Sequence, residues 1–234
     1  MLDEEIQLEQ SELLRLATET ATGIAYLHMP DVAIVHGDLK AANVLLTATR
    51  TVRICDFGMS EAKDRSKSMT AAATSSSSGG LTVAWTAPEL LHGQPKSFAS
   101  DIFALGVTVW EVFMRATPFK GMIDMVRRLP PRLAAAKESG LKQSRLAVQV
   151  VFNQLLANGR PPINRDTTPP RVCAIIEGCW AQEAKRRPTA GTVACILTNL
   201  LAELVAQQQA PAGAAGLGGR TTSAGFAPSA PPPP

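Results

Sequence analysis

Apolar side chains near the start of the chain recur at a spacing of three to four residues, the spacing of one face of an α-helix. The pattern ends where Pro30 and Asp31 interrupt it. We therefore expect a helix with one buried stripe that extends to about His28. The residues that carry the pattern are Leu13, Leu14, Leu16, Ala17, Ile24 and Leu27.

Three short runs of apolar and β-branched residues follow this predicted helix. They are Val32 to Val35, Val44 to Leu46 and Val52 to Cys55, and polar residues separate them. Such runs are typical of short strands. The second and third runs are joined by residues 47–51, a length that suits a hairpin connection.

The pattern disappears from Gly58 to Gly80, where Ala72 to Ser78 are only Ala, Thr or Ser. Such a stretch cannot bury enough apolar surface to be rigid, so we predict a mobile loop. Helical spacing then returns after Pro88 and continues to a last helix from about Thr189 to Gln208. Residues 209–234 are rich in Ala, Gly and Pro, and we predict that this tail is disordered.

The composition is that of one compact domain, because 45% of the 234 residues are hydrophobic. The net charge of +3 is too balanced to indicate nucleic acid as the main partner. The most apolar stretch, Ile102 to Met114, is too short to span a bilayer and contains Glu111. No secretory signal is visible after Met1. We therefore expect a cytoplasmic chain without membrane insertion.

The four cysteines show no C-x-x-C pairing, so the sequence indicates neither a zinc knuckle nor a redox motif. We expect them to be small buried apolar residues in a reducing compartment. They are Cys55, Cys173, Cys179 and Cys195.

Polar residues that could carry chemistry are concentrated at two places. The first is His36-Gly37-Asp38-Leu39-Lys40-Ala41-Ala42-Asn43, and the second is Asp56-Phe57-Gly58. They resemble the catalytic loop H-R-D-x-x-x-x-N and the metal loop D-F-G of eukaryotic-type protein kinases. Phosphoryl transfer needs a carboxylate to orient and deprotonate a hydroxyl, and divalent cations to neutralise phosphate charge.

The resemblance implies a role for each of these residues, with ATP and Mg2+ as cofactors. Asp38 would be the catalytic base, and Lys40 would lie against the transferred phosphoryl group. Asn43 and Asp56 would hold the metal. The predicted hairpin between the two motifs would bring both loops to one edge.

Further motifs follow in the order that the kinase family has them. Ala87-Pro88-Glu89 resembles A-P-E, the end of an activation segment that would span residues 56–89. By resemblance, Asp101 opens the next helix and binds the catalytic-loop backbone from below. Arg187 would pair with Glu89. The fold class implied for residues 1–208 is mainly α with short β-hairpins, that is, the large C-terminal lobe of a protein kinase.

The subclass implied is a tyrosine-kinase-like serine/threonine kinase, of the Raf-like or receptor-like kind. Lys40 after the predicted base favours serine/threonine specificity, and Thr82 resembles the threonine that supports the substrate hydroxyl. Trp85-Thr86-Ala87-Pro88-Glu89 and Cys179-Trp180 resemble tyrosine-kinase-like sequences. The expected partner is a protein substrate in signal transduction.

Three departures from the family pattern leave a second reading open. Gly37 stands in place of Arg before the predicted base, and Leu81 stands in place of Gly before Thr82. The 234 residues contain neither G-x-G-x-x-G nor V-A-I-K, the small-lobe motifs that hold ATP phosphates. The leading interpretation is therefore a truncated form of a serine/threonine kinase, with negligible activity of the chain alone and a partner that supplies or replaces the small lobe. The alternative is a catalytically inactive, kinase-derived binding or scaffold module.

Two expectations concern the chain outside these motifs. Residues 122–148 are longer than the family usually has at this place, and basic, which favours a solvated insertion over a partner site. If a longer parent protein is receptor-like, the domain would lie on the cytosolic face of a membrane.

Overall fold

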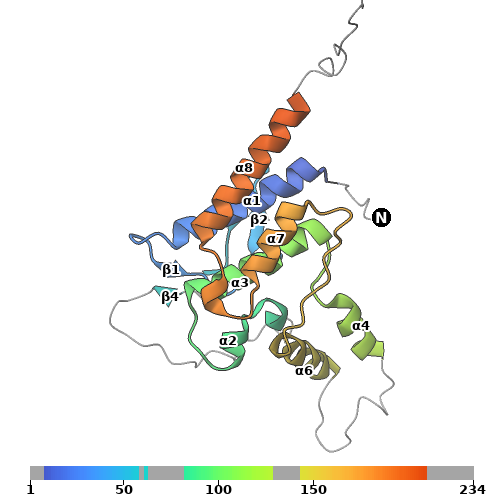
Figure 1. Ribbon diagram of the computed structural model, residues 1–234. Helices are drawn as coiled ribbons and strands as arrows, with labels where there is room; N and C mark the ends of the chain where they lie inside the picture. Colours follow the sequence, from blue (N-terminus) through green and yellow to red (C-terminus); the bar gives the residue numbers. More distant parts are fainter. Residues whose placement is uncertain (1–7, 58–60, 63–81, 129–142, 210–234) are drawn as a thin grey trace, which may run out of the picture.

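The computed structural model describes residues 8–57, 61–62, 82–128 and 143–209. In chain order its elements are α1 (Gln10–Leu27), β1 (Ile34–Val35), η1 (Ala41–Asn43), β2 (Val44–Leu46), β3 (Val52–Ile54), β4 (Glu61–Ala62), η3 (Thr82–Trp85), α2 (Pro88–Leu91), α3 (Phe98–Met114), α4 (Lys120–Arg128), α6 (Gln143–Leu156), α7 (Pro170–Cys179), η4 (Ala184–Arg186) and α8 (Ala190–Gln209). The predicted architecture, mainly α with short β-hairpins, is confirmed. α3 lies at the centre, α1 and α8 pack together, and α4 and α6 lie at the other end (Figure 1).

The first helix forms where its apolar stripe predicts. α1 buries Leu14, Ala17, Ala21 and Ile24, which lie three or four residues apart on one face. This face packs against α8 and α3. The helix ends at Leu27, next to the predicted end at His28.

The central helix begins earlier than the apolar run indicates. α3 starts at Phe98. The Ser97 side chain accepts a hydrogen bond from the Ser100 backbone N–H, and the Ser100 side chain accepts one from the Ser97 backbone N–H. This capping box stabilises the helix start. Asp101 therefore lies in the first turn rather than opening the helix, which corrects the prediction. Ser in place of the usual Glu or Gln at the third helical position hid the signal.

The strands form two separate antiparallel ladders. β2 pairs with β3 in the predicted hairpin, with Val44 opposite Ile54 and Leu46 opposite Val52. β1 pairs with β4, which lies inside the stretch predicted to be a mobile loop. The two residues of β4 correct that prediction, because a strand so short has no sequence period to reveal it. Residues 58–60 and 63–80 of the predicted loop lie outside the described residues.

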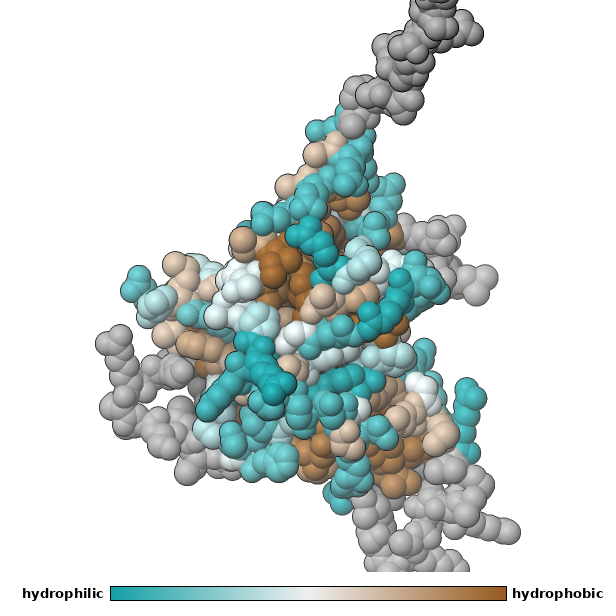
Figure 2. Space-filling model, in the orientation of Figure 1, coloured by the Kyte–Doolittle hydropathy of each residue, from teal (hydrophilic) through white to brown (hydrophobic). Residues whose placement is uncertain are grey.

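The last helix extends from Ala190 to Gln209, one residue later at each end than predicted. Of the helices in the described ranges, α8 is the one long and apolar enough to cross a membrane by length and composition. That is weak evidence for a membrane segment, because apolar helices of domain cores share this composition. α8 buries Val193, Ala194 and Leu197 and packs along α1. Figure 2 shows apolar surface where α8 and α1 cross.

The predicted insertion contains part of two helices. α4 and α6 pack against each other, with Ile123, Val126 and Val151 buried, and residues 129–142 between them lie outside the described part. The predicted tail beyond Gln209 also lies outside it. The expectation for the cysteines is half wrong: Cys173 and Cys179 are buried, Cys55 is half-buried and Cys195 is exposed.

Acidic and basic side chains tie α1 to the β2–β3 hairpin. Arg15 Nε donates to Glu12 Oε2 at 2.8 Å, and Arg50 Nε donates to Glu12 Oε1 at 3.0 Å. The Val52 backbone N–H donates to Glu19 Oε2 at 2.7 Å. These contacts hold the hairpin, and with it both loops at its open end.

This network predicts a dependence of stability on acid pH. Hydrogen bonds from Arg15 and Arg50 lower the pKa of Glu12 from 4.5 to about 2. Ionised Glu12 therefore contributes stability fully above pH 4.5, and the contribution disappears as the pH falls toward 2. We expect wild type to exceed Glu12→Gln in free energy of unfolding at neutral pH, with the difference vanishing across this window. Denaturant titrations at several pH values measure it, and a constant difference would contradict the assignment.

Candidate active site

Two predicted site residues lie at the open end of the β2–β3 hairpin. The Cys55 backbone N–H donates to the Asn43 carbonyl oxygen at 2.9 Å, one pair beyond the ladder. Because Asp56 follows Cys55, the hairpin brings Asn43 and Asp56 to the same edge. Asp56 is exposed and has a φ of 64°, a left-handed conformation that Asp adopts more readily than most residues.

Asp38 is at the centre of the site. Its Oδ2 accepts hydrogen bonds from Lys40 Nζ at 2.8 Å and from Asn43 Nδ2 at 3.2 Å. The same amide nitrogen donates to the Asp38 carbonyl oxygen at 2.7 Å. The Asp38 side chain is 15% exposed and that of Lys40 is 17% exposed. A carboxylate, an ammonium and an amide therefore form one cluster that solvent can still reach.

Asp101 holds loop 36–43 from the side of α3. Its Oδ2 accepts from the His36 backbone N–H at 2.8 Å, and its Oδ1 accepts from the Gly37 backbone N–H at 2.9 Å. His28 Nε2 lies 2.9 Å from Oδ2. Gly37 has a φ of 76°, a conformation that costs a residue with a Cβ about 1 kcal/mol. The departure from Arg at this position thus removes backbone strain.

The His36 side chain joins the two loops. It is fully buried, and its Nε2 lies 3.1 Å from the Cys55 carbonyl oxygen. Its ring centroid is 5.2 Å from that of Phe57, and its Nδ1 accepts from the Asp38 backbone N–H at 3.2 Å. These contacts are those of a packed structural residue rather than of a proton carrier.

η3 and Asp38 line the same small cavity. The cavity has a volume of about 30 Å³, and Asp38, Thr82, Thr86 and Asp101 are among its lining residues. That volume is enough for one water molecule. The Thr86 hydroxyl donates to the Thr82 carbonyl oxygen at 3.2 Å, which fixes the turn that carries Thr82. The fold therefore brings Thr82 to the same cavity as the predicted base.

Glu89 and Arg187 lie in contact away from this cavity. Arg187 Nη1 and Nη2 donate to the two carboxylate oxygens of Glu89 at 2.6 and 2.7 Å. Arg187 Nη1 also donates to the Ala99 carbonyl oxygen at 2.8 Å, and its side chain is fully buried. The pair joins α2 to the segment between η4 and α8, so its contacts are structural.

The sequence reasoning missed one residue of the site. Glu111 Oε2 accepts from the Ala41 backbone N–H at 2.9 Å and from Trp85 Nε1 at 2.6 Å. Burial raises the pKa of Glu111, and the hydrogen bonds from Ala41 and Trp85 and the charge of Lys40 oppose this increase. A lone carboxylate inside an apolar helix was the available signal, because a buried charge is costly unless it is paired.

The residues present fit a magnesium ion held partly by a nucleotide. The described ranges contain no group of three or more His, Cys, Asp or Glu residues that could form a metal cage. Mg2+ is usually bound by one or two protein oxygens together with phosphates and water. Asp56 supplies a carboxylate, and Asn43 uses its amide nitrogen for Asp38, which leaves its amide oxygen outside those two bonds.

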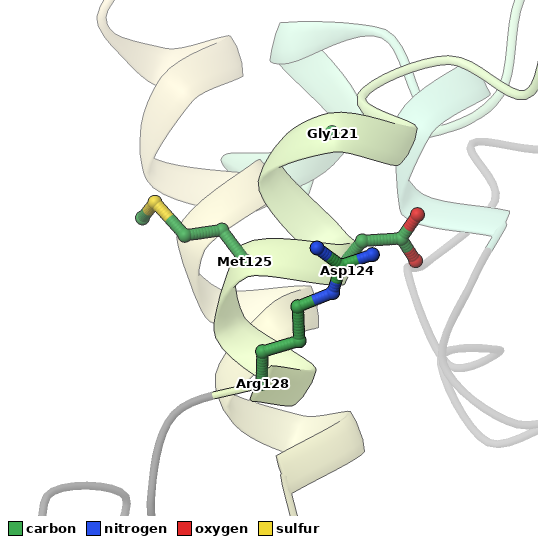
Figure 3. A pocket seen from close by; sticks show the side chains of 4 residues that line it. All are labelled: Gly121, Asp124, Met125 and Arg128. Carbon is green, nitrogen blue, oxygen red and sulfur yellow. The ribbon is translucent and has the colours of Figure 1, made fainter.

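A larger hollow lies elsewhere, on α4. It has a volume of about 440 Å³ and is lined by Gly121, Asp124, Met125 and Arg128 (Figure 3). None of these residues belongs to the loops or to η3. The hollow is therefore separate from the chemistry of Asp38.

Known proteins resemble this chain over most of its length. The family model for protein tyrosine and serine/threonine kinases matches residues 1–197. Serine/threonine-protein kinase CTR1 of Arabidopsis thaliana is 34% identical over 199 residues, which cover 85% of this chain and 21% of that protein. Probable serine/threonine-protein kinase SIS8 of the same plant is 30% identical over 194 residues, covering 83% of this chain and 16% of that protein.

A third relative differs in its described specificity. Dual specificity protein kinase shkC of Dictyostelium discoideum is 29% identical over 199 residues, covering 85% of this chain and 34% of that protein. The chain thus spans between about a sixth and a third of these relatives. The matched region includes both loops, η3, α3 and the Glu89–Arg187 pair. The chain belongs to the protein tyrosine and serine/threonine kinase family.

Proposed function

We propose that this chain is the catalytic lobe of an ATP-dependent protein kinase that phosphorylates serine and threonine hydroxyls of protein substrates. The observation that carries the proposal is the cluster of Asp38, Lys40 and Asn43, in which Lys40 Nζ and Asn43 Nδ2 both donate to the Asp38 carboxylate. Asp56 lies at the same edge of the hairpin. Asp38 and Asp56 are both accessible to solvent, as a base and a metal ligand need to be.

The chemistry assigned to the cluster is proton acceptance and charge stabilisation. As the substrate hydroxyl oxygen bonds to the γ-phosphorus, Asp38 accepts its proton, and the bond to the β–γ bridging oxygen breaks to release ADP. Lys40 places a positive charge beside the transferred phosphoryl group. Asn43 and Asp56 would hold Mg2+, which neutralises phosphate charge when bound.

Serine/threonine specificity is the finer part of the proposal. Lys40 beside the base and Thr82 at the shared cavity support it. CTR1 and SIS8 are named as serine/threonine kinases, while shkC is named as a dual specificity kinase. An acceptor panel of Ser, Thr and Tyr peptides would separate these specificities.

ATP binding to the purified chain is the first test. Calorimetry should show binding that requires Mg2+ and disappears in Asp56→Ala, because the carboxylate is the metal ligand. Asp166→Ala, which removes an exposed carboxylate outside the site, should bind like wild type. Asp38→Asn should keep binding but abolish transfer of labelled γ-phosphate. Transfer by Asp38→Asn at the wild-type rate would refute the role of the base.

A binding module without catalysis is the second candidate. Three exposed apolar side chains flank the site, with Leu45 at 53%, Leu46 at 48% and Phe57 at 44% exposure, and such a surface favours a covering partner. We propose that a small-lobe-like domain covers it, in the cytosol. Absence of nucleotide binding even at saturating Mg2+, in a chain that folds, would favour the binding module over the enzyme.

A further inference from the structure

Glu111 connects two elements that the proposed reaction needs. It is the one carboxylate in the second half of α3, a helix that is buried along most of its length. A single oxygen, Oε2, accepts from Ala41 on one side and from Trp85 on the other, at 2.9 and 2.6 Å. Both donors are N–H groups, so the oxygen acts as a shared acceptor between two segments that are far apart in the chain.

Each donor lies at one end of a short helix that carries a residue of the proposed site. Ala41 is the first residue of η1, and the N–H groups at a helix start have no acceptor within the helix. Lys40, at the cap position, supplies no side-chain hydrogen bond there. η1 ends at Asn43, which bonds to Asp38. Glu111 therefore caps, from another element, the short helix between the base and the predicted metal ligand.

Trp85 has the corresponding place in η3, which carries the predicted substrate residue Thr82. It is the last residue of η3, which begins at Thr82, and the Thr86 backbone N–H donates to the Val83 carbonyl oxygen at 3.0 Å. Trp85 and Thr82 therefore belong to the same turn, so a contact on the indole holds that turn. A carboxylate that holds both Ala41 and Trp85 sets the position of η1 relative to η3.

The electrostatics agree with a positioning role. Burial raises the pKa of Glu111, so the fold is less favourable with this charge than it would be with a neutral side chain. Lys40, the charged group acting on Glu111, also pairs with Asp38. A charged acceptor makes hydrogen bonds roughly twice as strong as a neutral one. The carboxylate thus strengthens two contacts at a cost in overall stability.

We propose that Glu111 is a positioning residue that holds the Asp38–Asn43 loop at a fixed place relative to Thr82–Trp85. It acts through Ala41 and Trp85 and not by touching the nucleotide or the hydroxyl. The inference deepens the proposed kinase function and rests on it for its purpose. The coupling itself concerns only the folded chain and can be measured without nucleotide.

The test is amide exchange by NMR on the full 234-residue chain, with Glu111→Gln and Glu111→Ala. We expect exchange at the Ala41 amide and the Trp85 indole N–H to rise several-fold in Glu111→Gln and by about tenfold or more in Glu111→Ala. Glu111→Gln should unfold at the same or a higher temperature than wild type, because the buried charge is gone. Faster local exchange without lower stability is the result that a purely structural role would not give.

Two further variants complete the design. Trp85→Phe removes one donor and should speed exchange at Ala41 as well, because the indole then no longer holds the carboxylate in place. Thr108→Val, which removes a buried hydroxyl bond within α3, is the control and should leave Ala41 exchange unchanged relative to global stability. Wild-type protection of Ala41 in both Glu111 variants would overturn the proposal.

Phosphate transfer then decides what the coupling is for. In a chain that transfers phosphate, Glu111→Gln should lower kcat by about tenfold. The KM for ATP should change little, since Glu111 does not touch the nucleotide. An unchanged kcat would overturn the positioning role. Absence of transfer in wild type, with the exchange result as expected, would refute the proposed function and leave the coupling established.

Discussion

Replacing Asp101 with alanine is expected to lower the free energy of unfolding by about 3–5 kcal/mol, a large fraction of the stability of a domain of this size. Asp101 is 1% exposed and accepts from two backbone N–H groups and one imidazole. Without the carboxylate, the backbone N–H groups of His36 and Gly37 lose this acceptor. An unpaired buried donor costs about 1–3 kcal/mol.

Asp101→Ala should affect loop 36–43 more than the rest of the chain. A second variant, Asp101→Asn, keeps the volume but replaces one acceptor oxygen with an NH2 group that faces a backbone donor. We therefore expect it to be destabilising as well, by less than Asp101→Ala. Denaturant unfolding followed by Trp fluorescence measures both variants.

Asp166→Ala is the matched control, because Asp166 is exposed and lies outside the loop contacts. It should change the free energy of unfolding by less than about 0.5 kcal/mol. If Asp101→Ala and Asp166→Ala had equal stability, the hydrogen bonds of Asp101 could not be holding the loop.

Arg187→Ala is expected to have an effect of similar size, about 3–5 kcal/mol. The guanidinium is fully buried and makes a bidentate pair with Glu89, whose side chain is 12% exposed. It also donates to the carbonyl oxygens of Ala99 and Ala181, at 2.8 and 2.9 Å. Truncation removes the donors of all these acceptors at once and leaves Glu89 as an uncompensated, mostly buried charge.

Arg187→Lys tests the geometry of the pair. An ammonium cannot reproduce the planar fork that reaches both Glu89 oxygens, so we expect this variant to be clearly less stable than wild type. The control is Arg171→Ala, which breaks an exposed pair with Glu203 at 53% and 54% exposure. Exposed pairs contribute at most about 1 kcal/mol. Thermal unfolding that ranks Arg171→Ala beside Arg187→Ala would contradict the burial argument.

The local part of the fold could be predicted from the sequence. The apolar period of α1 predicts its buried face and its end to within one residue, because helical spacing reports which face is buried. The β2–β3 hairpin follows from two short apolar runs and a connection of suitable length. The loop from Asp38 to Asn43 could also be identified, since its functional residues lie close together along the chain.

Contacts between distant segments were decided by the tertiary structure. β4 forms because β1 offers it a partner, and two residues carry no period of their own. α3 begins at Phe98 because Ser97 and Ser100 cap each other, while Asp101 turns to the loop instead. Periodicity shows that a face is buried, but the element that covers it is a property of the assembled core.

Glu111 shows the limit most clearly. The sequence presents one carboxylate within an apolar run, and this indicates only that a partner is needed. The partners are a backbone N–H seventy residues away and an indole twenty-six residues away. Neither separation has a sequence signal, because a hydrogen bond across the core depends on distances that exist only when α3, η1 and η3 have packed together.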